Sequence, residues 1–197
     1  MSVDWNACYH EGNTPWDKGE AHPALPELLA VHRDLLSRAG SLLVPGCGTG
    51  YDACFLAASL SAEVTGLDLA EEAIRRARHQ DSAGRVRWRQ GDFFSWDESA
   101  DLIFEHTCFC AIPVARRHEY VAAAARILPP GGHLFGIFFL NPDHQDEEGP
   151  PFGIEREGLF RFFEDSFEVL WRQAPARTYP GREGEGRELC VLFKRRA

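Results

Sequence analysis

The stretch LLVPGCGTGYDACFLAASLSAEVTGLDLA, residues 42–70, decides the fold. An apolar strand is expected over 41–44 and runs directly into the glycine-rich turn PGCGTG. A helix is expected over 51–59, and a second strand over 62–67 ends at Asp68. A strand, a glycine turn, a helix and a second strand in this order predict a βαβ unit with parallel strands.

The same alternation continues on both sides of this unit. Further helices are expected over 23–38, opening at Pro23, and over 71–81, 115–128 and 155–163. Further strands are expected over 85–89, 101–105, 133–140, 167–171 and 189–193, with a long loop over 141–153. This order predicts an α/β fold of the Rossmann-like kind, with a seven-stranded, mostly parallel sheet and helices on both faces. The last two strands have no helix between them, which predicts an antiparallel edge hairpin.

Composition bounds the class of protein. The chain has 197 residues, of which 44% are hydrophobic and 26% charged, values typical of a globular protein, and we expect a single domain over 1–197. The net charge of −9 argues against a nucleic-acid partner, because phosphate binding needs clustered Lys and Arg. The longest apolar run, 134–140, is too short to span a bilayer. We expect a small-molecule substrate, no membrane partner, and a monomer rather than an obligate oligomer.

The cysteines and the N-terminus indicate the compartment. Six cysteines form no CxxC pair, and no histidines accompany them at zinc spacing, so we expect no metal site. The first residues, MSVDW, lack the basic and apolar regions of a signal peptide. We therefore expect a cytoplasmic protein with reduced thiols.

The glycine turn at 46–50 is the first candidate binding site. Glycines let the backbone turn sharply and approach a ligand beside a helix N-terminus; the alternative is a tight turn without a ligand. A dinucleotide fingerprint, GxGxxG, would require glycine where this chain has Tyr51. Asp68 ends the next strand, where a carboxylate can accept hydrogen bonds from ribose hydroxyls, or cap the following helix, or do both.

The segment GDFF at 91–94 follows the third strand. Asp92 is suited to hydrogen-bond an adenine amino group, and Phe93 to pack on the base. A loop with a buried pair of phenylalanines is the alternative. Beside the glycine turn and Asp68, the adenine interpretation is favoured.

With these motifs in place, the sequence resembles the thiopurine S-methyltransferase superfamily, in particular its branch of halide and thiol methyltransferases. The pattern GxGxG resembles the first motif of S-adenosylmethionine-dependent methyltransferases. The segments that carry the resemblance are TPWDKG at 14–19, LVPGCGTGYDA at 43–53, GLDLA at 66–70, GDFFSW at 91–96, DLIFEHTCFCAIP at 101–113, PPGG at 129–132, GPPFGI at 149–154 and GREGEGRE at 181–188.

The resemblance implies S-adenosylmethionine as the cofactor, with S-adenosylhomocysteine as the product, and it implies a set of contacts. An aromatic triplet closes over the cofactor, as part of an N-terminal lid over 1–20. Trp5 and Tyr9 are four residues apart and would share a helix face; the alternative is a hydrophobic clasp on the core. Two positions depart from relatives, which often carry Trp at position 9 and Tyr or Arg at 106. The predicted cofactor-binding residues are Trp5, Tyr9, Trp16, Gly46, Gly48, Asp68, Leu69, Asp92, Phe93 and His106.

The resemblance also implies the reaction. A methyl group would pass by in-line displacement to a small soft nucleophile: a thiol or thiolate, a halide or a chalcogen species. Such chemistry needs mainly positioning and exclusion of water. If the acceptor is a neutral thiol, a base would help, and His106 or Glu105 is a candidate, although the two side chains can equally form a satisfied pair. Arg182 is the second candidate catalytic residue: it could attract an anionic acceptor, and the family brings its loop to the mouth of the active site.

Several alternatives accompany this prediction. The acceptor could be a larger heteroaromatic thiol such as a thiopurine; other classes are a nicotinamide-dependent oxidoreductase or a binding protein without turnover. Arg116 and Arg117 are expected at a solvated helix start. Cys108 and Cys110, two apart in an expected extended segment, would point to different sides and serve as packing residues.

Overall fold

The computed structural model describes residues 3–140 and 149–197. Within these residues, seven strands form one sheet in the order β3-β2-β1-β4-β5-β7-β6. Strands β1 to β5 run parallel, whereas β7 is antiparallel to both β5 and β6. The strands are β1 Ser41–Pro45, β2 Glu63–Asp68, β3 Val86–Gln90, β4 Leu102–His106, β5 His133–Phe139, β6 Phe167–Gln173 and β7 Glu188–Arg195. The predicted sheet and its antiparallel edge are confirmed.

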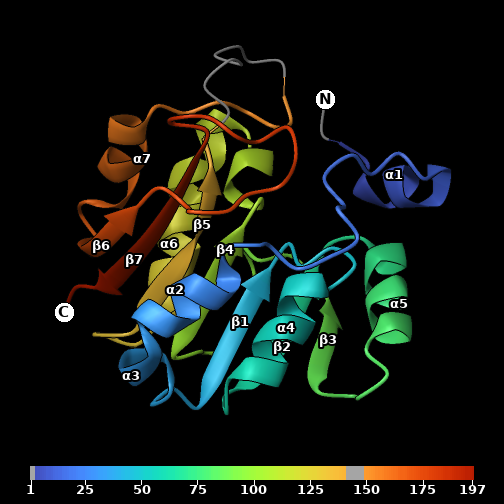
Figure 1. Cartoon of the computed structure of the whole chain (residues 1–197), viewed down its shortest axis with the longest axis horizontal. Coiled ribbons are helices and arrows are strands. Elements are labelled where there is room, and N and C mark those ends of the chain that lie inside the picture. The colour runs from blue at the N-terminus through green and yellow to red at the C-terminus, as the bar shows by residue number, and fades with distance from the viewer. Residues whose placement is uncertain (1–2, 141–148) are drawn as a thin grey trace.

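Helices cover both faces of this sheet (Figure 1). One apolar core lies under α2, α4 and α5, and the other lies under α6 and α7. The helices are α1 Trp5–Glu11, α2 Leu25–Val31, α3 Arg33–Leu36, α4 Tyr51–Ser59, α5 Glu71–Gln80, α6 Arg117–Ile127 and α7 Arg156–Phe163, with 3-10 turns at Phe109–Ala111 and Val114–Arg116. Among the residues described, no helix has the length and apolar character needed to cross a membrane.

The central strands are apolar on both sides because each side faces a core. In β1, Leu42 and Val44 pack into one core and Leu43 into the other. Successive side chains of a strand point to opposite faces. A strand buried on both faces therefore reads as a continuous apolar run, which is typical of parallel sheets.

The helix predicted over 23–38 is wrong in its extent. The chain forms α2 and α3 with a break at His32, whose backbone leaves helical geometry (φ −111°, ψ 18°). The His32 ring packs edge-on against Trp171 of β6, with ring centroids 4.7 Å apart. Apolar residues keep helical spacing across the break, so periodicity alone does not reveal it. Most of the loop predicted over 141–153 lies outside the described residues.

The carboxyl ends of β1, β2, β3 and β4 meet at one edge of the sheet, as parallel strands require. Each predicted motif follows one of these strands: the glycine turn follows β1, Asp68 ends β2, and Gly91 and Asp92 follow β3. In open α/β sheets, ligands bind at this edge. The topology thus brings together motifs that are far apart in the sequence.

Candidate active site

The turn between β1 and α4 depends on two glycines. Gly46 and Gly48 have φ values of 58° and 54°, in the left-handed region that favours glycine. A Cβ on Gly46 would stand 3.0 Å from Cys108 Sγ, and one on Gly48 would stand 2.9 Å from Tyr9 Oη. The missing side chains keep the backbone of the turn accessible from the cavities beside it.

Asp68 holds this turn against the start of α5. Its Oδ2 accepts a hydrogen bond from the Gly48 amide at 2.8 Å, and its Oδ1 accepts one from the Ala70 amide at 2.9 Å. Burial raises the pKa of Asp68, although the backbone donors oppose that effect. Ala70, rather than Asp68, is the N-cap residue of α5. Each carboxylate oxygen retains a further lone pair for a ligand hydroxyl.

A cavity of about 310 Å³ lies at this edge of the sheet. The predicted residues that line it are Trp5, Tyr9, Trp16, Gly46, Asp68, Leu69, Asp92, Phe93 and Arg182. Gly48 and His106 instead line a smaller adjoining cavity, which shares Tyr9, Trp16, Gly46 and Thr107 with the larger one. Phe93 is buried and its ring lies 4.9 Å from that of Tyr120, so only part of it faces the cavity.

The aromatic triplet forms one cluster beside this cavity. Trp16 packs edge-on against Trp5 and Tyr9, with ring centroids 5.4 and 5.9 Å apart, and its Nε1 donates to Tyr9 Oη at 3.1 Å. Helix α1 lies against α5 (Figure 1), where Arg76 donates to the Tyr9 carbonyl and the Glu72 amide donates to Asn6. The predicted face shared by Trp5 and Tyr9 on a helix is therefore present.

The other part of the cavity belongs to the β4, β5 and β7 side of the sheet, away from Asp68 and Asp92. We call it the Arg182 end; it is lined by Cys110, Phe139, Pro150 and Arg182. The Arg182 guanidinium lies 4.5 Å from the centre of the Phe139 ring. Among the described residues of this end, Arg182 is the single cation and the others are apolar.

The predicted extended segment around Cys108 and Cys110 is wrong. The chain forms a 3-10 turn over Phe109–Ala111, because Ala111 and Ile112 donate back to the carbonyls of Cys108 and Phe109. In this turn both cysteines line the same cavity. Burial raises the pKa of both thiols. The two cysteines shape the cavity wall as neutral groups.

Glu105 and His106 do not form the pair considered as an alternative. They are adjacent on β4 and point to opposite faces of the sheet. Glu105 is buried and accepts hydrogen bonds from the Phe109 amide at 2.8 Å and from Tyr120 Oη at 2.6 Å. These donors occupy Glu105 in holding the β4 turn together. His106 pairs instead with Asp52, whose Oδ2 lies 2.6 Å from its Nδ1.

The two arginines at the start of α6 differ from each other. Arg116 is exposed and pairs with Glu119 at 2.8 Å, as expected for a solvated helix start. The same expectation is wrong for Arg117, which is buried and donates to the carbonyls of Phe152 and Gly153 at 2.8 and 3.1 Å. These two hydrogen bonds anchor the segment next to Pro150 at the Arg182 end, because the two backbone carbonyls need a hydrogen-bond donor.

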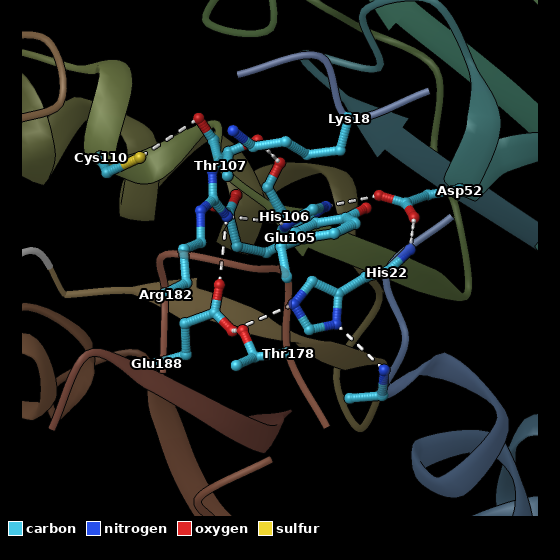
Figure 2. A network of polar contacts seen from close by, with 12 residues as sticks. Lys18, His22, Asp52, Glu105, His106, Thr107, Cys110, Thr178, Arg182 and Glu188 are labelled. Atoms are coloured by element: carbon cyan, nitrogen blue, oxygen red, sulfur yellow. Dashed lines mark hydrogen bonds and ion pairs between the residues drawn. The ribbon is translucent and has the colours of Figure 1, made fainter. Parts of the chain in front are cut away.

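Beside the Arg182 end lies a mostly buried polar network whose connections the sequence did not reveal (Figure 2). Arg182 Nη1 lies 3.1 Å from Glu188 Oε1 and 3.4 Å from His106 Nε2. Glu188 Oε2 lies 3.1 Å from His22 Nε2, and the Asp52 carboxylate accepts the His22 backbone amide at 2.8 Å. We call these five residues the charge cluster. They come from four separate segments; the sequence named His106 and Arg182 as candidates, but not His22, Asp52 or Glu188.

The charge cluster contains side chains of the types that bind metal ions, although the sequence predicts no metal site. One atom each from His22, His106 and Glu188 lies within 4.8 Å of the others. Arg182 already donates to two of the three, His106 and Glu188. A cation therefore already pairs with two of the three candidate ligands, and the geometry favours an ionic network.

Comparison with known proteins agrees with this fold. A sequence model of the thiopurine S-methyltransferase (TPMT) family matches residues 2–177. Thiocyanate methyltransferase 1 of Brassica oleracea is 35% identical over 156 residues, which cover 76% of this chain and 66% of that protein. Probable thiol methyltransferase 2 of Arabidopsis thaliana is 36% identical over 159 residues, covering 78% and 68%. The match spans about two thirds of the length of these plant relatives.

Solved structures give the same fold at low sequence identity. N-methyltransferase NodS from Bradyrhizobium japonicum WM9, in complex with S-adenosyl-l-homocysteine, superposes with a TM-score of 0.72 at 16% identity, covering 97% of both chains. The fold and the site define a class I S-adenosylmethionine-dependent methyltransferase. Within that class, the chain belongs to the thiopurine S-methyltransferase family. Membership in this family argues against the alternative of a nicotinamide-dependent oxidoreductase.

The residues of the cavity fit S-adenosylmethionine. A Cβ on Gly46 or Gly48 would enter the cradle beside the turn. Asp68 has acceptor capacity for ribose hydroxyls, and the aromatic triplet supplies ring faces to a sulfonium, which is a cation. The detailed contacts of Trp5, Tyr9, Trp16, Gly46, Gly48, Asp68, Leu69, Asp92, Phe93 and His106 with the cofactor remain predictions.

Proposed function

We propose that this chain transfers the methyl group of S-adenosylmethionine to a small soft nucleophile, such as a thiol, a thiolate, a halide or a chalcogen species. The observation that carries the proposal is the size and lining of the cavity. Its volume of about 310 Å³ is at the low end of small-molecule sites, and donor and acceptor must share it. The Arg182 end is apolar with one guanidinium, which suits a small, polarisable acceptor.

In this proposal the protein positions the reactants and excludes water. The bound cofactor supplies an activated methyl group on a sulfonium. Asp68 and the glycine turn hold its nucleoside part, and the aromatic triplet covers the sulfonium. The apolar lining at Phe139 and Pro150 keeps water from the acceptor path, which strengthens the attack of a soft nucleophile. Relatives named for thiocyanate and thiol methylation support this acceptor class.

A larger heteroaromatic thiol such as a thiopurine is the second candidate. It is favoured by the Thiopurine S-methyltransferase of Vibrio parahaemolyticus, which is 28% identical over 176 residues, covering 81% of this chain and 80% of that protein. The small volume of the cavity argues against it.

A panel of acceptors ranked by size tests the proposal. Purified protein is incubated with S-adenosylmethionine and, separately, a small aliphatic thiol, thiocyanate, iodide and a thiopurine, and S-adenosylhomocysteine is measured. We expect the small acceptors to give the higher kcat/KM. A clear preference for the thiopurine would replace the proposed acceptor with the second candidate.

We further propose that the whole chain, residues 1–197, is one methyltransferase domain that acts as a monomer in the cytoplasm. All six cysteines are free thiols, which is compatible with a reducing compartment. The net charge of −9 supports a small-molecule substrate over a nucleic-acid partner.

We also propose that residues 1–20 form a lid that becomes ordered over the cofactor. The triplet presents its rings to the cavity, and α1 is tied to α5 by two hydrogen bonds between side chains and backbone and by packing of Tyr9 against Ala70 and Ala73. We expect S-adenosylhomocysteine to slow proteolytic cleavage near residues 10–20 several-fold, because closure buries this segment. Cleavage at Arg85, in the turn after α5, serves as the internal control. Equally slow cleavage near residues 10–20 in both states would mean a permanently packed segment.

A further inference from the structure

We propose that the Asp52–His106 pair is a proton acceptor for the methyl acceptor, which is therefore an undissociated thiol. The inference rests on the proposed function and narrows its acceptor class. The thiol S–H bond breaks and its proton passes to His106 Nε2. The thiol sulfur forms the new bond to the methyl carbon while the sulfonium carbon–sulfur bond breaks, and that electron pair stays on the sulfur of S-adenosylhomocysteine.

The geometry fixes which nitrogen of His106 is free to take a proton. A guanidinium only donates hydrogen bonds, so the Nε2 that faces Arg182 Nη1 at 3.4 Å is the nitrogen with the lone pair. The proton of the neutral ring is then on Nδ1, which donates to Asp52 Oδ2 at 2.6 Å. A carboxylate on Nδ1 holds the imidazole in this tautomer and stabilises the imidazolium that forms.

When the rings of His22 and His106 are both neutral, the charge cluster carries a net charge of one negative unit. Burial opposes ionisation of both carboxyl groups, but hydrogen bonds from His22 and Thr178 lower the pKa of Glu188, and the charge and hydrogen bond of a protonated His106 lower the pKa of Asp52. Arg182 supplies one positive charge. Burial lowers the pKa of His22, which keeps that ring neutral. One proton on His106 therefore makes the cluster neutral, and a buried neutral network is preferred to a charged one.

The surroundings of His106 direct the incoming proton to it. Asp52 approaches from α4, and the rings of His22 and Tyr179 lie with centroids 4.9 and 6.0 Å away. Arg182 and Glu188 face it from the β7 side, while Glu105, adjacent on β4, is occupied by its own donors. His106 lines the smaller cavity, which shares Thr107 with the larger one.

Arg182 completes the arrangement. Its contact with Nε2 is long, at 3.4 Å, whereas its contact with Glu188 is 3.1 Å. When a proton reaches Nε2, two donors face each other and the weaker contact breaks, while Glu188 still holds the guanidinium. A thiol at the Arg182 end can therefore replace this contact without dismantling the cluster. Arg182 and Asp52 act here as positioning residues.

The test compares two acceptors that differ in their need for a base. A small aliphatic thiol is mostly protonated near neutral pH, since its pKa is about 8.5 or above, whereas thiocyanate is already an anion. For His106→Gln we expect kcat for the thiol to fall about 100-fold, the lower range for general-base catalysis, and kcat for thiocyanate to fall much less. His79→Gln, which changes an exposed histidine of α5, is the matched control.

The pH profile and the ring tautomer give independent readouts. Wild-type turnover of the thiol should level off at high pH, whereas in the variant it should keep rising with the thiolate concentration. Nitrogen NMR of the labelled imidazole should report Nδ1–H in the unliganded wild type and a changed tautomer in Asp52→Asn. Equal losses for both acceptors, or Nε2–H in the wild type, would overturn the inference and leave the proposed function standing. A wild type that methylates neither acceptor would overturn both.

Discussion

Replacing Asp68 with alanine is expected to weaken S-adenosylmethionine binding by about 1–3 kcal/mol, or roughly 5- to 150-fold in Kd. Asp68 Oδ2 and Oδ1 accept the amides of Gly48 and Ala70, and we propose that the remaining lone pairs accept the ribose hydroxyls. The variant lacks the carboxylate that would accept the ribose hydroxyls. It also leaves two backbone amides without a hydrogen-bond acceptor, so the turn no longer forms the site before the ligand binds.

Isothermal titration calorimetry on the purified variant measures this effect. Asp97→Ala removes an exposed carboxylate that is not among the residues lining the cavity and should leave Kd unchanged. Asp68→Asn retains the shape and one acceptor oxygen, so it separates loss of the ligand contact from collapse of the turn. An unchanged Kd for Asp68→Ala with an intact fold would mean that Asp68 only ties the turn to α5.

The Glu188→Gln variant is expected to be less stable than the wild type at neutral pH. In acid the difference should disappear, because the wild type then loses the same contribution. Burial disfavours the ionised form of Glu188, but hydrogen bonds from His22 and Thr178 and the charge of Arg182 outweigh it and lower its pKa to about 2, from 4.5. A lowered folded-state pKa means that Glu188 contributes stability above pH 4.5, which is lost as pH falls toward about 2. The contribution is on the order of 3 kcal/mol at neutral pH.

Chemical denaturation at several pH values tests this expectation. The variant should be less stable at neutral pH, and the gap between the two proteins should close as pH falls below about 4. Glu168→Gln, which changes an exposed carboxylate on β6, should track the wild type throughout. Parallel loss of stability in the wild type and Glu188→Gln over this range would show that Glu188 makes no such contribution.

Local patterns were enough to predict the sheet and one half of the site. The glycine turn, Asp68 and Asp92 each follow a strand, and parallel strands end at a common edge, so the sequence order implied their meeting. Trp5 and Tyr9 share a helix face because they are four residues apart. These predictions use spacing within one element or the order of adjacent elements.

The Arg182 end depends on long-range packing that spacing does not encode. Glu188 contacts His22, which is 166 residues away in the sequence. His106 pairs with Asp52 and not with its sequence neighbour Glu105. Neighbours on a strand face opposite sides, so adjacency suggested the wrong pair. Arg117 is buried because it donates to the carbonyls of a distant segment. The local sequence does not show these partners, so Arg117 reads as an exposed residue at a helix start.

Transfer of a labelled methyl group tests the central claim most directly. Purified protein is incubated with S-adenosylmethionine carrying a radiolabelled methyl group and a small thiol. We predict that label appears in the methyl thioether in the same amount as the S-adenosylhomocysteine formed. Tight binding of S-adenosylhomocysteine without transfer of label to a thiol, thiocyanate or iodide would contradict the account and indicate a binding protein without turnover.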